Sequence, residues 1–396
     1  MKIVNIEDFF IPDAGYQINI LPKYLAKFGH EVYIITASVD EFKDSTSSFF
    51  GTNNMRERDE EFTRKTGVKI IRITPIVKRF VSGRIIFGPS LFKTIKALKP
   101  DILFAHGNDT VSGICAIRKK LPFAVITDSH MLKMASTNKF SKYFQTGYRK
   151  FVTPKIIKKD ITVIRTQDDN YVEEYLGIPL SRAPWISYGT DLDLFCPDVD
   201  QKRAFRLENN IPEDNFVFVY TGKMNEAKGG RLLAEAFLKK FDTHKNVTLI
   251  TVGNLSGEYG EEVKAIFDKS ENQIVQFPTQ KYTDLAKFYQ AADACVFARQ
   301  CSLSFYDAQG CALPVISENN NINVDRNSHN NGLCFEAENL ESFRETIEKI
   351  LNMSCEEYEA MSKNARDFIS QNYNYETKAR EYEKEIIDAY QKFTGK

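Results

Sequence analysis

The sequence predicts an α/β protein with two doubly wound parallel sheets, one in each half of the chain. Short β-branched segments alternate with amphipathic segments of helix length, which is the pattern of a parallel sheet wrapped by helices. The 396 residues suffice for two domains. Charge divides the chain as well: residues 1–195 hold 29 Lys and Arg against 21 Asp and Glu (+8), and the remaining residues hold 24 against 32 (−8).

The bulk composition excludes several classes of protein. A hydrophobic content of 42% and a charged content of 27% are ordinary for a globular protein. No apolar run reaches the ~18 residues that span a bilayer, and Glu7 and Asp8 stand where a signal peptide needs apolar residues. Seven cysteines without a CxxC pair indicate reduced thiols, so we expect a cytoplasmic protein in which Cys301 and Cys311 serve packing.

The first half contains six predicted strands. Between several of them lie amphipathic helical segments, such as residues 91–98 and 111–119. The polar residues 41–65 are predicted to form a loop with some helix. The strands are short and β-branched, and they occupy residues 3–6, 32–36, 68–73, 102–105, 123–127 and 161–164.

The loop after the first strand is a candidate ligand contact. Gly15 lies between that strand and the next helix, and a glycine lets the backbone approach a phosphate or a sugar closely. Taken alone this signal is weak, because many such loops contain a glycine. Gly29 predicts the end of the helix, and we interpret His30 beside it as a structural surface residue.

Two histidines stand at the ends of predicted strands. His106 ends the segment DILFAH, and His130 ends FAVITDSH. Sheets of this class place their ligand contacts at the carboxyl ends of strands, so either histidine could contact a ligand. The alternative is a hydrogen-bonded histidine without a ligand role, and the residues by themselves leave both interpretations open.

A basic segment covers residues 131–159. It contains eight Lys and Arg and no acid, interleaved with Phe, Tyr, Met and Ile. Contact with anionic lipid headgroups, binding to nucleic acid and a plain solvated helix are the three interpretations. We favour a peripheral contact with an anionic membrane surface, and we expect no nucleic acid partner because no recognised binding motif is present.

The second half repeats the alternation of strands and helices. A loop with Lys223 and Lys228 follows the predicted strand at residues 216–220. A polar turn separates the strand at residues 294–298 from a helix of residues 303–312, and a strand-to-helix junction of this kind suits an anion. Further strands are predicted within residues 247–254, at 274–277 and at 314–317.

Two other segments bear on organisation and metal binding. Asp191 and Asp193 look like a metal-binding pair, but aspartates also stabilise turns, and we expect no metal there. Residues 375–393 predict an amphipathic helix. Its apolar face consists of Ala379, Tyr382, Ile386, Ala389 and Phe393.

The stretch of residues 294–317 resembles the donor-site signature of the family 4 glycosyltransferases, which have the two-domain GT-B fold. That signature has two glutamates eight positions apart, then Ala, a small residue and Gly-x-Pro-Val-Ile. Residues 307–308 and 313–316 match it. Arg299 stands at the position of the first glutamate and Asp307 at the position of the second, so the motif is a variant.

Other motifs follow in the family's order along nearly the whole chain. The loop that ends at His130 resembles the family's histidine loop, whose histidine contacts the donor sugar. The loop from Gly222 resembles the family's G-R-x4-K-G loop, with Lys223 in the arginine position and Lys228 in the lysine position. Two fixed cations of this kind stabilise a leaving diphosphate. Gly15 matches one of two glycines in the family's first loop.

The resemblance implies a domain organisation. Two Rossmann-like domains would face each other across a cleft. Residues 1–195 would form the acceptor-side domain, with the helix of residues 375–396 packing back on it. Residues 196–374 would bind the donor.

The resemblance also implies an activity. The protein would transfer a sugar from a nucleotide-diphosphate donor, a UDP-sugar, to a glycan or a polyprenol-linked acceptor. The anomeric configuration would be retained, as in enzymes that build bacterial capsules and other surface polysaccharides. No cofactor and no metal would be needed, and the enzyme would lie in the cytoplasm or on the inner face of the plasma membrane.

The site residues follow from the same resemblance. Asp307 would accept hydrogen bonds from the ribose hydroxyls, and the backbone amides at the start of the helix would bind the diphosphate. The catalytic residues would be His130, Lys223 and Lys228. The donor-binding residues would be Gly15, Gly222, Lys223, Lys228, Arg299, Leu303, Ser304 and Asp307.

Arg299 is the sharpest departure from the family, because an arginine cannot accept hydrogen bonds from sugar hydroxyls. One hypothesis is a donor sugar with a carboxylate, a uronic acid, which Arg299 would pair with. The other is that Arg299 pairs with a nearby acid of the protein. Two alternative functions stay open at this point: an inactive GT-B-shaped binding protein, and a UDP-sugar epimerase on the same fold.

Overall fold

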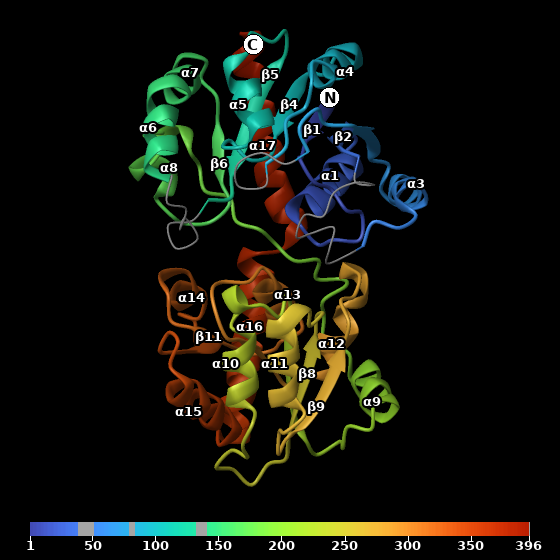
Figure 1. Cartoon of the computed structure of the whole chain (residues 1–396), viewed down its shortest axis with the longest axis vertical. Helices are drawn as coiled ribbons and strands as arrows, with labels where there is room; N and C mark the ends of the chain where they lie inside the picture. The colour runs from blue at the N-terminus through green and yellow to red at the C-terminus, as the bar shows by residue number, and fades with distance from the viewer. Residues whose placement is uncertain (39–50, 79–83, 132–140, 396) are drawn as a thin grey trace. The chain divides into compact units, whose positions relative to one another are not determined.

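A computed structural model describes residues 1–38, 51–78, 84–131 and 141–395 (Figure 1). The chain forms two compact units. Unit 1 comprises Met1–Tyr188 and Glu376–Lys396, and unit 2 comprises Gly189–Tyr375. The predicted boundary at residue 195 therefore falls inside unit 2, because the segment after Gly189 bonds to residues of that unit: Thr190 pairs with Asn374 in a parallel bridge.

Unit 1 is built on a six-stranded parallel sheet with the strand order β3-β2-β1-β4-β5-β6. Every residue from Ile3 to Ile6 in β1 is buried. Because successive residues of a strand face opposite sides, both faces of the sheet are covered, as expected for a parallel sheet. The strands are β1 (Lys2–Ile6), β2 (Glu31–Ala37), β3 (Lys69–Ile73), β4 (Ile102–Ala105), β5 (Ala124–Ser129) and β6 (Val163–Arg165).

Helices alternate with these strands. For residues 41–65 the sequence predicts a loop with some helix. Residues 39–50 lie outside the described residues, and the described part of this segment contains most of α3. The helices of unit 1 are α1 (Gln17–Lys27), α3 (Met55–Thr66), α4 (Ser90–Leu98), α5 (Val111–Arg118), α6 (Ser141–Phe151), α7 (Thr153–Lys158), α8 (Tyr171–Glu174) and α17 (Tyr375–Thr394), with a 3-10 turn η2 (Leu180–Arg182).

The last helix, α17, lies in unit 1 apart from its first residue. The Tyr382 hydroxyl donates to the carbonyl of Ile186 (3.0 Å), and His30 Nε2 lies 2.8 Å from a carboxylate oxygen of Glu383. His30 is thus a structural residue. The predicted apolar face is buried except at Phe393, which is 51% exposed.

Unit 2 repeats the topology of unit 1, with the strand order β12-β11-β10-β7-β8-β9. All six residues of β7 and of β8 are buried, so these two strands form the centre of the core. The strands are β7 (Phe216–Thr221), β8 (Val247–Val252), β9 (Gln273–Phe277), β10 (Ala294–Phe297), β11 (Val315–Glu318) and β12 (Gly332–Phe335).

The helices of unit 2 follow the same alternation. They are α9 (Val199–Glu208), α10 (Gly230–Ala236), α11 (Gly257–Phe267), α12 (Ala286–Ala291), α13 (Ser304–Gly310), α14 (Asn321–Arg326), α15 (Leu340–Leu351) and α16 (Cys355–Asn372), with 3-10 turns η3 (Glu226–Lys228) and η4 (Tyr282–Asp284).

The strand order positions the loops that matter for function. In each unit the order reverses beside the first strand, so the loops after β1 and β4 are neighbours in unit 1, and the loops after β7 and β10 are neighbours in unit 2. Ligands of doubly wound sheets bind at this switch point, at the carboxyl ends of the strands. The loop that contains Lys223 and Lys228 follows β7, and the loop that contains Arg299 follows β10. Both loops therefore lie at the switch point of unit 2.

Candidate active site

Two loops meet at the carboxyl end of the unit 2 sheet. The first contains Gly222 and Lys223 and follows β7, and the second contains Arg299 and follows β10. Gly229 has a left-handed backbone (φ 70°), and a Cβ atom placed on it would lie 3.1 Å from Arg299 Cβ and 3.2 Å from Ala298 Cβ. The loops therefore touch where only a glycine fits.

Lys228 joins the two loops. Its ammonium group donates to the carbonyl oxygen of Cys301 (3.1 Å), so it faces the turn that precedes α13. Burial lowers the pKa of Lys228, and the positive charges of Lys223 and Arg326 lower it further. A buried ammonium group that is repelled by two other cations is stabilised by an anion between them.

Arg326, in α14, is a cation of this site that the sequence interpretation missed. It is 2% exposed. Its guanidinium group donates to the carbonyl of Ser302 (2.9 Å) and to the Tyr306 hydroxyl (3.1 Å), and it lies over the rings of Phe305 and Tyr306. No motif marks an arginine in this helix, so only the tertiary structure brings it under the turn.

The start of α13 differs in part from the prediction. Leu303 stands at the N-cap position without a side-chain cap. The amide of Ser304 already donates to Ser302 Oγ (3.3 Å), so a phosphate contact there would replace this bond. Gln300 has a left-handed backbone (φ 58°), and its amide donates to the buried carboxylate of Glu318 (3.0 Å), which fixes the course of the turn.

Arg299 pairs with an acid of its own unit. Its guanidinium group contacts the carboxylate of Glu338 and donates to the carbonyl of Glu226 (3.2 Å). Arg299 and Glu338 line a hollow of about 540 Å³ together with Tyr259 and Arg231. The second of the two hypotheses for Arg299, pairing within the protein, matches this geometry.

Asp307 lies below the surface of unit 2 and is 5% exposed. Its carboxylate accepts hydrogen bonds from Thr190 Oγ1 (2.5 Å) and the Tyr282 hydroxyl (3.1 Å). Burial raises the pKa of Asp307 to about 7. These two contacts are made to hydroxyls of its own unit and hold the segment after Gly189 in place, and the expected hydrogen bonds to ribose hydroxyls stay a prediction.

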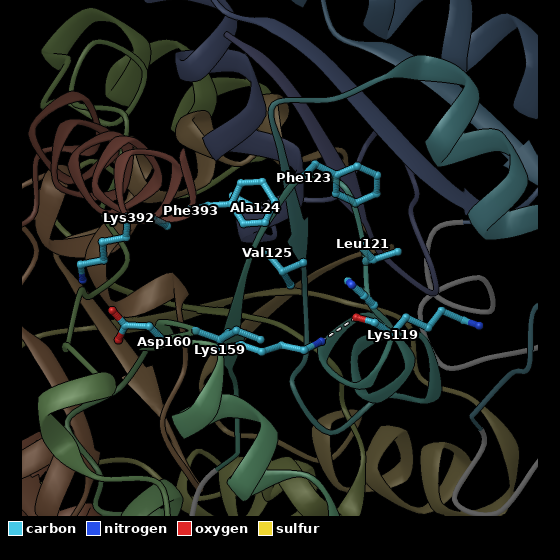
Figure 2. Close-up of a pocket in the computed structure, with 12 residues that line it drawn as sticks. Lys119, Leu121, Phe123, Ala124, Val125, Lys159, Asp160, Lys392 and Phe393 are labelled. Atoms are coloured by element: carbon cyan, nitrogen blue, oxygen red, sulfur yellow. Dashed lines mark hydrogen bonds between the residues drawn. The ribbon is translucent and has the colours of Figure 1, made fainter. Parts of the chain in front are cut away.

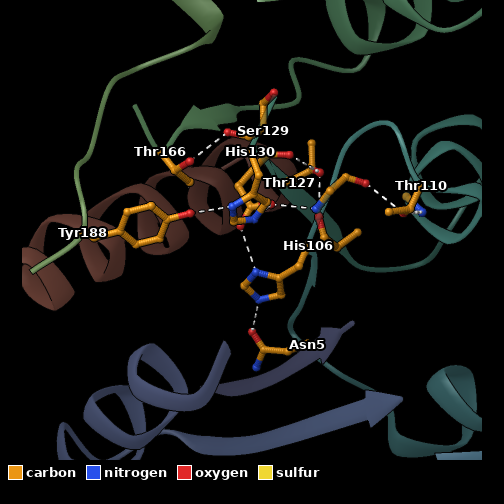
Figure 3. A network of polar contacts seen from close by, with 12 residues as sticks. Asn5, His106, Thr110, Thr127, Ser129, His130, Thr166 and Tyr188 are labelled. Carbon is orange, nitrogen blue, oxygen red and sulfur yellow. Dashed lines mark hydrogen bonds and ion pairs between the residues drawn. The ribbon is translucent and has the colours of Figure 1, made fainter. Parts of the chain in front are cut away.

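A polar network occupies the carboxyl end of the unit 1 sheet (Figure 3). Asp128, at the end of β5, is buried. Its carboxylate accepts from His106 Nδ1 (2.8 Å), from His130 Nε2 (3.1 Å) and from the amide of Gly107 (2.7 Å). His130 Nδ1 lies 2.6 Å from the Tyr188 hydroxyl. Both ring nitrogens of His130 are therefore engaged, whereas the sequence interpretation expected one of them to be available to a sugar hydroxyl.

The ionisable groups of this network shift one another's pKa values. Burial would raise the pKa of Asp128, but the two histidines lower it far below its usual range. Desolvation opposes protonation of His130, yet Tyr188, Asp128 and Glu7 raise its pKa well above the ordinary value. Desolvation and the neighbouring Asp8 raise the pKa of Glu7, which follows β1, to about 8.

Possible metal ligands occur in two places. His106, Asp128 and His130 each offer a ligand atom within 4.8 Å of the others, but each of these atoms takes part in the hydrogen bonds just described. Asp191 Oδ1 accepts from the amides of Asp193 and of Leu194 (3.2 and 3.3 Å). The aspartate pair thus has the turn geometry that its sequence predicts.

Gly15 precedes α1, and the first residue of that helix is unusual. Gln17 is 4% exposed, and neither its amide nitrogen nor its amide oxygen has a hydrogen-bond partner among the described residues. A buried amide without partners is costly unless a water or a ligand satisfies it. The loop of Gly15 therefore remains a candidate ligand contact.

A separate pocket of about 480 Å³ lies at the opposite, amino end of β5 (Figure 2). Lys119, Lys159 and Lys392 line it, with Phe123 and Phe393 among the apolar residues. The Lys159 ammonium group donates to the carbonyls of Ile117 and Lys119 (2.6 and 2.5 Å), so this lysine caps the end of α5.

The basic segment of residues 131–159 is described from residue 141 onward, and residues 132–140 lie outside the described residues. In α6 and α7 it exposes Tyr143, Phe151 and Ile157 to solvent. No helix in the described parts of the chain is long and apolar enough to cross a membrane.

Sequence comparison finds a family model that part of this chain matches. Residues 201–368 match the family described as Glycosyl transferases group 1. An uncharacterized glycosyltransferase of Methanocaldococcus jannaschii is 24% identical over 238 residues, which is 57% of each chain. The D-inositol 3-phosphate glycosyltransferase of Segniliparus rotundus is 26% identical over 171 residues, 41% of this chain and 37% of that protein. The chain thus covers less than two thirds of these relatives.

Solved structures match the whole fold. A glycosyltransferase from Rickettsia africae ESF-5 superimposes with a TM-score of 0.72 at 18% identity, over 99% of this chain and 98% of that one. Anabaena HepE in complex with UDP and glucose gives 0.72 at 15% identity, over 97% and 98%. The two parallel six-stranded sheets are those of the GT-B fold, and the residues that match the family model, 201–368, include Lys223, Lys228 and Arg326.

Proposed function

We propose that the protein transfers a sugar from a nucleotide-diphosphate donor, a UDP-sugar, to a glycan or polyprenol-linked acceptor, with retention of the anomeric configuration. The observation that carries this proposal is a cluster of cations: Lys228 and Arg326 both donate to the turn before α13, and the charge of Lys223 acts on Lys228. It lies at the switch point of a glycosyl transferases group 1 domain, where doubly wound sheets bind their ligands.

The cluster suits a diphosphate leaving group. Negative charge grows on the leaving phosphate as the glycosidic bond breaks, and fixed cations in a partly buried site stabilise that charge. Burial and then the repulsion from Lys223 and Arg326 lower the pKa of Lys228, and an anion between these cations relieves the repulsion. No metal ion is needed for this chemistry, because the protein supplies the positive charge.

UDP is the proposed nucleotide because a protein of the same fold binds it: HepE was solved with UDP and with UDP-glucose. For the sugar we favour a neutral hexose over a uronic acid. Arg299, the side chain that would pair with a uronate, is already paired with Glu338 and with the carbonyl of Glu226. A uronate would have to displace Glu338.

The proposal is tested by thermal shift and by turnover. UDP should raise the melting temperature of the protein, because a ligand that binds the native state stabilises it. UDP-glucose and UDP-galactose should then be consumed faster than UDP-glucuronate. Binding of UDP without turnover of any donor would favour the inactive binding protein, and conversion of the donor without acceptor would favour the epimerase.

A charge-removing variant links the activity to the cluster. Lys228→Gln should weaken UDP binding by about tenfold to a hundredfold, the range for one charge-assisted hydrogen bond of ~1.5–3 kcal/mol. The matched control is Lys264→Gln, because Lys264 is exposed in α11 and pairs with Asp268. Equal affinity of the two variants for UDP would refute the assignment of the cluster as the diphosphate site.

The proposed acceptor also bears on where the enzyme acts. A lipid-linked acceptor for a surface polysaccharide would place the enzyme on the inner face of the plasma membrane. Exposed Tyr143, Phe151 and Ile157 among the lysines of α6 and α7 support a peripheral contact with anionic lipids. Sedimentation with vesicles of phosphatidylglycerol, but not of phosphatidylcholine, is the expected result at low salt.

A further inference from the structure

The pocket at the amino end of β5 has no part in the proposed transfer. Its volume of about 480 Å³ falls within the range of small-molecule sites, about 300–1,000 Å³. Three parts of the chain meet there: the segment from Lys119 into β5, the connection from α7 to β6, and the end of α17. All three belong to unit 1. The pocket thus lies within one unit, at the opposite end of the sheet from the switch point.

The buried part of the pocket lining is apolar. Phe123, Ile161 and Ala389 are only 4%, 3% and 7% exposed. Phe393 also lines the pocket but is 51% exposed, and Figure 2 shows it on the opposite side from Leu121. A large aromatic side chain beside an apolar hollow is surface that the hydrocarbon part of a ligand would remove from water.

The pocket also carries an excess of positive charge. Asp160 is the one acid among the residues that line it, and its carboxylate is paired with the guanidinium group of Arg182. Apolar surface beside unbalanced positive charge is complementary to a molecule with an apolar body and an anionic head. Four lysines supply the charge: Lys119, Lys120, Lys159 and Lys392.

A lysine near a helix end can simply stabilise the helix carbonyls, and Lys159 does so at the end of α5. Its ammonium group donates to the carbonyls of Ile117 and Lys119. An ammonium group has three N–H donors, and the described residues provide acceptors for these two. Burial and the nearby Lys155 lower the pKa of Lys159, an effect that an anion beside it would oppose.

Lys392 and Lys120 show that the charge exceeds what the helices need. Earlier in α17, Lys384 pairs with Asp388 (2.8 Å). Lys392 follows Asp388 by four residues, which is the spacing of a helical ion pair. Even so, neither the Lys392 nor the Lys120 ammonium group has a hydrogen bond or an ion pair within the described parts of the chain. Both cations are therefore available to a ligand.

We propose that this pocket binds a single-chain amphipathic anion, a hydrocarbon chain with a carboxylate head of the fatty-acid type. The chain lies against Phe123 and Phe393, and the head lies among the lysines. The site is separate from the sugar transfer proposed above, because the cation cluster for the diphosphate belongs to unit 2. Occupancy of the pocket should therefore leave the affinity for UDP unchanged.

The first experiment measures binding of unbranched carboxylates to the full-length protein by calorimetry. From hexanoate to decanoate the affinity should rise about twofold to fourfold for each added CH₂, because each one buries more apolar surface. Added salt should weaken binding. Octanol and acetate, which each lack one half of the ligand, should bind about tenfold more weakly than octanoate or less. Equal binding of either one would overturn the proposal.

The second experiment assigns the binding to the pocket. Lys392→Gln should weaken octanoate binding by about threefold or more, because one cation is lost. Its matched control is Lys27→Gln, since Lys27 is an exposed lysine of unit 1 that pairs with Glu376. Phe393→Ser should weaken binding by about threefold to tenfold through lost apolar contact. Its control is Phe151→Ser, at an aromatic residue of α6 that is 55% exposed.

All four substitutions change exposed side chains, so the variants should fold. Equal octanoate affinities in a variant and its control would remove the assignment to this pocket.

The third experiment identifies the unit and the source of the ligand. In scanning calorimetry, octanoate should raise the unfolding transition of unit 1. The variant Ile386→Ala, in the core of that unit, identifies this transition. A shift of the other transition alone would contradict the proposal. So would displacement of bound octanoate by vesicles of phosphatidylglycerol, because the occupant would then be a membrane surface. None of these outcomes depends on UDP binding or on turnover, so the two proposals fail separately.

Discussion

Ala312 adopts a backbone conformation that suits glycine. Its φ is 61°, in the left-handed region where a Cβ atom costs about 1 kcal/mol. It stands where the glycosyltransferase signature has its glycine, so the chain carries strain there. Ala312→Gly should raise the free energy of unfolding by about 0.5–1 kcal/mol, measured by urea denaturation. Ala308→Gly in α13, where the backbone is helical, should destabilise instead by about 1 kcal/mol.

Arg326 combines a structural and a binding role in one side chain. Arg326→Met keeps the volume but leaves the carbonyl of Ser302 and the Tyr306 hydroxyl without a donor, which should cost about 2–3 kcal/mol of stability. Loss of its charge should also weaken UDP binding, measured by calorimetry on the folded fraction. Arg231→Met, at an exposed arginine of α10 paired with Glu262, is the matched control and should change stability by less than about 0.5 kcal/mol.

At the scale of the element, the carboxyl group of Asp307 links α13 to Thr190, in the segment after Gly189. Burial raises the pKa of Asp307 to about 7, above its ordinary value of 3.8. The folded state therefore binds a proton that the unfolded state releases between about pH 4 and pH 7, and stability from this group is lost as the pH rises through that window.

Asp307→Asn should remove this dependence. An asparagine is neutral at every pH and can still accept from Thr190 and Tyr282 through its carbonyl oxygen. The variant should gain stability relative to the wild type at pH 7.5 by on the order of 1–3 kcal/mol, and little at pH 4.5. Melting curves at the two pH values measure the difference, and an equal offset at both would show that Asp307 does not titrate in the folded protein.

The elements that the sequence predicts well are those fixed by local pattern. The buried runs of β1, β7 and β10 are short and largely apolar, and the turn between β10 and α13 follows from its polar residues. The approach of Lys228 to that turn is also predictable, because a doubly wound order makes the loops after β7 and β10 neighbours.

The features that the sequence does not predict depend on partners distant along the chain. Arg299 bonds to Glu338, and Asp307 bonds to Thr190. Asp128 takes two of its donors from His106 and Gly107, at the end of β4. No periodicity or motif encodes which acid meets which base across such separations. The partners of Asp307 are the clearest case, since its place in the motif implied ribose hydroxyls and gave no sign of Thr190 or Tyr282.

At the scale of the whole molecule, the chain ends in the unit where it begins. Ile386 of α17 is fully buried in unit 1. Ile386→Ala should cost about 2–5 kcal/mol, the range for removing a buried aliphatic side chain. Calorimetry should show the loss in the transition of unit 1 alone, because the residue belongs to that core. The exposed Val199→Ala in α9 is the control and should leave both transitions in place.

The two units should also respond differently to nucleotide. The proposed diphosphate cluster lies wholly within unit 2, and separate cores of a multidomain chain can unfold in separate steps. UDP should therefore raise the unit 2 transition, by an amount that grows with the logarithm of its concentration, while the transition weakened by Ile386→Ala stays where it is. A shift of the Ile386-sensitive transition, with the other unmoved, would place the nucleotide in unit 1 and contradict the assignment. Ile386→Ala marks which unfolding transition belongs to unit 1. The experiment therefore locates the nucleotide site independently of whether the protein transfers a sugar.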